Sequence, residues 1–165
     1  MALTYWDPTT VVSRGNTLIA VAPAIVDINS PTLAELDTST VIDCSMTGFN
    51  ASSSVSSETV DWLCSPVSET LSSSIEHSVD DLTIKVSGQA DDDALLSVFT
   101  PGSILYLWRR DGLPHQVDLE AGQRVWVWKV SVSSIDPVDA TNTFIGLVVH
   151  LTALNRTETP VAITA

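Results

Sequence analysis

Apolar and polar residues alternate along much of the chain, and this pattern predicts strands. In the segment 81–87, every second residue from Leu82 to Val86 is apolar, which is typical of a half-buried strand. A strand is predicted at 104–110, and its part 104–108 and the segment 124–132 are apolar on both faces, so each strand is expected to be covered on both sides. Further strands are predicted at 17–21, 39–44, about 60–64 and 144–151.

One segment, 91–99, changes to a helical period. Its apolar residues Ala94, Leu95, Val98 and Phe99 fall on one stripe of a helix. Three aspartates, Asp91-Asp92-Asp93, stand at its positively polarised start, and Pro101-Gly102 prevents its continuation. A single helical turn is also expected at 30–36, with Ser30 as N-cap and Pro31 in the first helical position. The pattern therefore predicts a mainly β fold, a β-sandwich or small barrel of about seven strands with one flanking α-helix.

The length of 165 residues favours a single domain, 1–165. Residues 1–12 are expected to form an irregular arm, because the residue before Pro8 is pushed out of the α region. Residues 155–165 are interpreted as a C-terminal arm. The serine-rich stretch 45–78 is too long for a structureless loop in a compact domain, so we expect a long excursion with a short strand or hairpin at its centre.

Composition excludes several classes of function. The chain has 20 acidic and 7 basic residues and a formal net charge of −13, and it therefore lacks the cations that bind phosphates. No apolar run approaches the ~20 residues of a membrane span, and the first residues lack the features of a signal peptide, so a cytoplasmic protein is expected. Cys44 and Cys64 are too few for a disulfide scaffold or a zinc site, and we interpret them as buried thiols, with a bridge between them left open.

No pattern of catalytic or cofactor-binding residues is evident. The aspartates 91–93 are interpreted as a helix start and not as a metal site, because consecutive side chains point in different directions. His77, His115 and His150 have no i, i+4 spacing, and the serines do not lie on a Gly-x-Ser-x-Gly elbow. Catalytic groups sometimes meet only in the fold, but we expect neither an enzyme nor a cofactor.

Two basic and two aromatic residues remain to be placed. Arg109-Arg110 ends a predicted strand and could bind a phosphate, but a charge pair at the strand edge or a contact with an acidic neighbour is the preferred interpretation. Trp126 and Trp128 could stack on bases, as in single-strand binders. Without a basic groove around them, burial in the core or in a subunit interface is expected instead.

The order of these segments resembles the tail tube (major tail) proteins of long-tailed bacteriophages. The resemblance lies in the early strand at 17–21, the Pro31 turn before the strand at 41–44, the serine-rich excursion, the strand–helix–strand of 82–108 with its aspartate-rich helix start, and the closing pair 124–132 and 144–151. It covers most of the chain and depends on order and spacing.

The resemblance implies a structural virion protein that forms hexameric rings stacked into a hollow tube. Joining sheet edges between subunits would remove the exposed edges of a lone β domain. The implied partners are further copies of the chain, the tape-measure protein, the tail terminator and baseplate proteins, with double-stranded DNA passing through without specific binding. The expected location is the virion tail, assembled in the bacterial cytoplasm and without a membrane.

The resemblance also assigns roles to particular residues. Contacts between subunits are expected from the arm 1–12, the excursion 45–78 and the arm 155–165, and the individual candidates are Tyr5, Trp6, Trp62, Leu63, Arg109 and Arg110. Acidic residues facing the channel would repel phosphate over the ~8 Å that salt leaves unscreened. The candidates for this lining are Asp43, Asp80, Asp81 and Asp136.

Two alternatives share this composition and strand spacing. One is a ligand-binding β-sandwich module of the carbohydrate-binding or adhesion type, which would be a monomer in solution. The other is a tail-completion or terminator protein of the same fold, which would form one ring and not a long tube.

Overall fold

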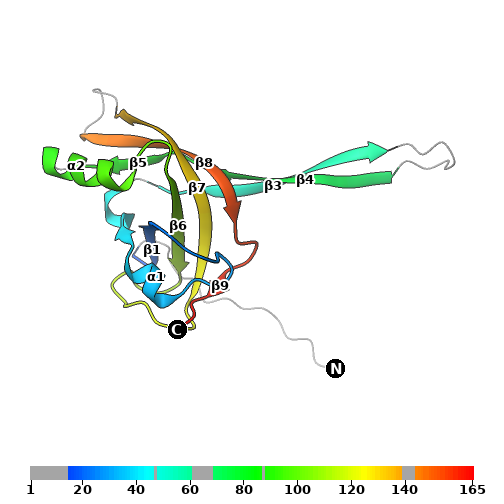
Figure 1. Cartoon of the computed structure of the whole chain (residues 1–165), viewed down its shortest axis with the longest axis horizontal. Coiled ribbons are helices and arrows are strands. Elements are labelled where there is room, and N and C mark those ends of the chain that lie inside the picture. The colour runs from blue at the N-terminus through cyan, green and yellow to red at the C-terminus, as the bar shows by residue number, and fades with distance from the viewer. Residues whose placement is uncertain (1–14, 47, 61–68, 87, 139–143) are drawn as a thin grey trace.

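A seven-stranded antiparallel sheet forms the body of the computed structural model, which describes residues 15–46, 48–60, 69–86, 88–138 and 144–165 (Figure 1). Its main path runs in the order β2-β1-β6-β7-β8-β5, and β9 pairs with β7. The strands of this sheet are β1 (Thr17–Ala22), β2 (Thr40–Val41), β5 (Leu82–Lys85), β6 (Ile104–Asp111), β7 (Arg124–Pro137), β8 (Gly146–Arg156) and β9 (Val161–Ala162).

The remaining elements lie outside this sheet. Strands β3 (Ala51–Val60) and β4 (Glu69–Val79) pair with each other in a separate two-stranded hairpin. Two α-helices, α1 (Leu33–Asp37) and α2 (Gln89–Val98), and a 3₁₀ turn, η1 (Asp43–Ser45), complete the described elements. None of these helices has the length and apolar content of a bilayer-spanning segment.

The sheet is curled into a half-barrel, and irregular pairing between β7 and β8 explains part of the curl. Leu154 is an extra residue in β8 and Ser133 is an extra residue in β7, as the shifts in the pairing register show. Such bulges bend a strand and increase its twist. The curl lets Met46, just after η1, form an isolated bridge with Ile84 of β5, so the chain from one sheet edge reaches the other.

Both faces of the sheet are buried, as the two-sided apolar strands predict. One face carries a core that includes Leu107, Trp128 and Val130, against which Leu95 and Val98 of α2 pack. The opposite face carries a second core that includes Trp108 and Val127, covered by Leu36 of α1 and by Ile163. Alternate residues of β6 and β7 thus enter different cores, which is the geometry of a pleated strand.

Helix boundaries differ slightly from the sequence prediction. Helix α2 begins at Gln89, two residues before the predicted start, and Ala94 of the predicted apolar stripe is exposed. Helix α1 is capped by Thr32 and not by Ser30, because Thr32 and Glu35 form a reciprocal capping box. The backbone N–H groups of Thr32 and Val26 donate to the Glu35 carboxylate and hold its pKa below the usual value.

The expected C-terminal arm lies on the body of its own chain. Asn155 and Arg156 extend β8, residues Val161–Ala162 form β9, and Ile163 is buried in the second core. Thr164 then exchanges backbone hydrogen bonds with the segment before α1, donating to Pro31 at 2.9 Å and accepting from Leu33 at 2.8 Å. Apolar burial and backbone pairing therefore hold this segment in place.

Arg110 of β6 is fully buried and organises the connection between β6 and β7. Its Nη1 donates to the carbonyl oxygen of Val117 at 2.8 Å and to Oε1 of Gln123 at 3.0 Å, and its Nη2 donates to the carbonyl of Pro114 at 2.9 Å. Burial lowers the pKa of the Arg110 guanidinium. The side chain thus holds this connection together by donating to several of its acceptors.

Replacing Arg110 by methionine should reduce the free energy of unfolding by about 2–4 kcal/mol, because several hydrogen bonds from this buried side chain are lost together. Urea denaturation of the monomeric protein measures the effect. Arg124→Met removes a guanidinium from an exposed position and should change the free energy by less than about 0.5 kcal/mol. Equal stability of the two variants would contradict the role assigned to Arg110.

Gly146→Ala should loosen the pairing of β5 with β8. A Cβ atom at position 146 would overlap the backbone carbonyl oxygen of Ile84, which cannot move away as a flexible side chain could. A loss of about 1–3 kcal/mol is expected, with faster amide exchange along β5. Gly48→Ala is the control, since a Cβ there meets open space. Unchanged exchange in β5 of the Gly146 variant would show that the pairing tolerates the extra atom.

Candidate functional site

The hairpin of β3 and β4 projects from the body as a long two-stranded arm (Figure 1). Its base belongs to the core, where Val79 is buried and Ala51 packs against the same cluster. Because side chains alternate between faces, Val55 and Ile75 lie on the same face as the Ala51–Val79 pair. Val55 is 58% exposed and Ile75 is 54% exposed. The polar pair Ser53–His77 lies between these two apolar pairs on the same face. This face, which we call the apolar face, therefore begins in the core and carries a second apolar pair in solvent.

The opposite face of the hairpin is polar and made largely of serine. The hydroxyl oxygens of Ser52 and Ser78 lie 2.7 Å apart, and those of Ser56 and Ser74 lie 2.6 Å apart. These cross-strand hydrogen bonds satisfy hydroxyl groups within the hairpin and contribute to its pairing. The hairpin thus has two chemically different faces.

The structure confirms a hairpin in the serine-rich stretch, but the hairpin is longer than expected. Its strands have 10 and 11 residues, and serine hydroxyls pair across it. The predicted central strand around 60–64 falls largely on residues 61–68, which lie outside the described residues. Trp62, Leu63 and Cys64 are among them, as are Tyr5 and Trp6 in 1–14.

Asn50 and Asp80 close the base of the hairpin. The backbone N–H of Asp80 donates to the carbonyl of Asn50 at 3.0 Å, and Nδ2 of Asn50 donates to Oδ2 of Asp80 at 3.3 Å. Asp80 and Asp81 then connect β4 directly to β5. These hydrogen bonds therefore join the two ends of the hairpin at its base.

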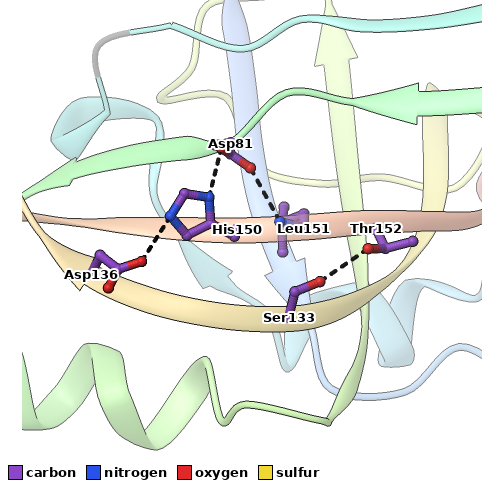
Figure 2. A network of polar contacts seen from close by, with 6 residues as sticks. All are labelled: Asp81, Ser133, Asp136, His150, Leu151 and Thr152. Atoms are coloured by element: carbon purple, nitrogen blue, oxygen red, sulfur yellow. Dashed lines mark hydrogen bonds and ion pairs between the residues drawn. The ribbon is translucent and has the colours of Figure 1, made fainter.

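Next to this base, His150 of β8 lies between two carboxylates, an arrangement that we name the histidine bridge (Asp81, His150 and Asp136; Figure 2). Nδ1 of His150 is 2.7 Å from Oδ2 of Asp81, and Nε2 is 3.0 Å from Oδ2 of Asp136. The other oxygen of Asp81 accepts the backbone N–H of Leu151 at 3.4 Å. The histidine bridge therefore joins the connection after β4 to both β7 and β8.

A bulge in β7 lies beside the histidine bridge. Its extra residue, Ser133, places its hydroxyl 3.0 Å from that of Thr152 on β8 (Figure 2). The sequence offered no signal for this site, because Asp81 and His150 are 69 residues apart. Only pairing of β5 with β8 brings them together.

The structure places two of the predicted channel acids, Asp81 and Asp136, in the histidine bridge, and a third, Asp80, at the hairpin base. The fourth, Asp43, lies in η1, where its carboxylate accepts the backbone N–H of Cys44 at 2.7 Å. The negative charge of Asp43 raises the pKa of the Cys44 thiol. Cys44 is exposed, which corrects the expectation that it is buried.

The two arginines at the end of β6 differ in environment. Arg109 is partly exposed, pairs with Asp111 at 2.9 Å and lies over the rings of Phe49 and Trp128. Arg110 is buried, and its Nη1 and Nη2 donate to groups of its own chain. Trp128 lies in the core as expected, stacked on the half-buried Trp126.

Within the described residues, no group of three or more histidine, cysteine, aspartate or glutamate side chains could hold a metal ion. The histidine bridge places its two carboxylates on different nitrogens of one ring, so these groups do not converge on a common point. The arrangement is suited to joining strands by hydrogen bonds and ion pairs.

Comparison with known proteins agrees with the fold. A family model described as "Phage tail tube protein" matches residues 4–165. Among solved structures, the tail tube of SPP1, determined by solid-state NMR and cryo-EM, superposes with a TM-score of 0.60 at 11% identity, covering 92% of this chain and 79% of that chain. A search of curated proteins found no significant match. The match over nearly the whole length means that this chain belongs to the phage tail tube protein family.

Proposed function

We propose that the chain assembles into hexameric rings, which stack into the tail tube of a long-tailed phage and conduct double-stranded DNA during genome ejection. Membership of the tail tube family supports a structural role in the virion tail. The observation that carries the finer proposal is the projecting β3–β4 hairpin, whose apolar face extends beyond the core of its own chain.

A second copy of the chain is the occupant that suits this face. A two-stranded hairpin is only marginally stable in water by itself, and within the described residues β3 and β4 pair only with each other. Both outer edges of the hairpin therefore keep backbone groups that a strand or loop of another copy could satisfy. Covering Val55 and Ile75 would also remove apolar surface from water.

The residues that the sequence analysis named as contact candidates are part of this proposal. We propose that Tyr5 and Trp6 of the N-terminal segment, and Trp62 and Leu63 between β3 and β4, contact neighbouring copies, and that the exposed part of Arg109 meets an acidic neighbour. The segment 155–165 would take part through the surface it presents beside β8 and β9. The tape-measure, terminator and baseplate proteins are the proposed partners at the tube ends.

The acidity of the chain fits a channel that must not retain DNA. Each copy brings a formal charge of −13, and closely spaced carboxylates repel phosphate over a distance of ~8 Å at physiological salt. We propose Asp43, Asp80, Asp81 and Asp136 as candidates for the channel lining. Asp81 and Asp136 would be the weaker contributors while His150 offsets part of their charge.

Val55→Asp should abolish tube formation while leaving the body folded, because a charge would be placed on the face that another copy covers. Ser56→Asp adds the same charge to a neighbouring position on the polar face, opposite Ser74, and it should still form tubes. Electron micrographs of the concentrated proteins, with circular dichroism as a check of folding, make the comparison. Tubes from the Val55 variant, or an unassembled wild-type monomer at high concentration, would refute the assignment.

Lysine at channel positions should slow genome ejection, because a cation would bind the passing phosphates. Asp80→Lys and Asp43→Lys phages are compared with phages carrying Glu120→Lys, an exposed position outside the proposed lining and the proposed contact segments. Ejection rates followed by DNA release in vitro should fall for the first two and stay unchanged for the third. Equal rates in all three would argue that these acids do not face the DNA.

A further inference from the structure

Both ring nitrogens of His150 face a carboxylate oxygen (Figure 2). An ionised carboxylate only accepts hydrogen bonds, whereas a neutral imidazole has one N–H and one lone pair. The contacts at 2.7 Å to Asp81 and 3.0 Å to Asp136 are therefore hydrogen bonds together only when the imidazole carries both protons. Loss of one proton to solvent leaves one carboxylate facing a lone pair.

The histidine bridge lies where the hairpin joins the main sheet, so loss of this proton would weaken the attachment of the hairpin. Asp81 follows Asp80, which closes the hairpin base, and it also accepts the N–H of Leu151. His150 lies on β8 and Asp136 lies near the end of β7. The bridge therefore fixes the chain leaving the hairpin to two strands of the main sheet.

We propose that the histidine bridge is a proton-dependent lock that fixes the hairpin on the sheet, so that assembly of further copies on the hairpin weakens as His150 loses its second proton. This inference rests on the proposed role of the hairpin as the contact between copies. Its sign follows from the hydrogen bonds: the lock is complete when the imidazole carries both protons, and it opens when rising pH removes one of them.

The titratable groups around His150 determine which side chains could respond to a change in pH. In the described part of the chain, Asp81 and Asp136 are the carboxylates within ion-pair distance of the His150 ring. The other titratable residues on the elements around it are Asp80 in the connection after β4, Lys85 on β5, Glu69, Glu76 and His77 on β4, Arg124 and Lys129 on β7, and Arg156 on β8. His77 is the other histidine in this set, so it needs a separate variant.

The first test uses the monomer and does not depend on assembly. Amide exchange protection of Leu151 and Asp80 is measured at roughly pH 5.5 and roughly pH 8, on either side of the range for histidines. In the wild type, protection should fall by about three- to fivefold at the higher pH, the size expected for a partly exposed ion pair. His150→Gln should show the lower protection at both pH values, while His115→Gln and His77→Gln should follow the wild type.

The second test measures pelletable polymer at the same two pH values. The wild type and the His115→Gln control should polymerise more readily at the lower pH, and His150→Gln should lose this difference. Wild-type protection that is equal at both pH values, or a pH response that persists in His150→Gln, overturns the lock. Absence of polymer at every pH contradicts the proposed function instead, because the protection measurements on the monomer stand independently of it.

Discussion

The constraint on which this structure depends is that the apolar face of the β3–β4 hairpin does not end where the core ends. Ala51 and Val79 pack inside the body, yet the Val55–Ile75 pair on the same face lies in solvent. Burying such side chains stabilises a protein by roughly 25 cal/mol for each Å² removed from water. Within the described residues, the body therefore leaves this apolar surface of the hairpin uncovered, and the proposed function assigns it to another copy of the chain.

Other features of the fold serve to hold that hairpin in a defined direction. The bulges at Ser133 and Leu154 curl β7 against β8, and β5 pairs with the far side of β8. This curl brings Asp81 and Asp136 to opposite nitrogens of His150. The sheet is buried on both faces, whereas the side chains of the histidine bridge at its edge are partly exposed to water. The family to which the chain belongs builds tubes, and a hairpin of fixed direction is useful to a subunit that must repeat itself.

Much of the fold could be predicted from the sequence because its signals are local. Strand β5 alternates between apolar and polar residues because one of its faces is buried. Strands β6 and β7 are apolar on two faces because both faces enter a core. The helix α2 was predictable from its change of period. A hairpin in the serine-rich stretch was also expected, but its length and register were not, because they depend on hydroxyl pairs across two strands, such as Ser52 with Ser78. Sequence order carries no information on that register.

The histidine bridge could not be predicted from the sequence, because it too depends on the register of paired strands. Asp81 and Asp136 were singled out as acids, but their shared partner His150 becomes visible only once β5, β7 and β8 are paired. Arg110 was taken for a surface cation, because a strand-end arginine next to Asp111 and Gly112 usually is, whereas its burial depends on the fold of the following connection.

Electron cryo-microscopy of the assembled wild-type protein tests the central claim most directly. The account predicts a tube in which the Val55–Ile75 face of each hairpin is buried against another copy. A tube whose hairpins leave this face in solvent, or particles of single chains at high concentration, would contradict it.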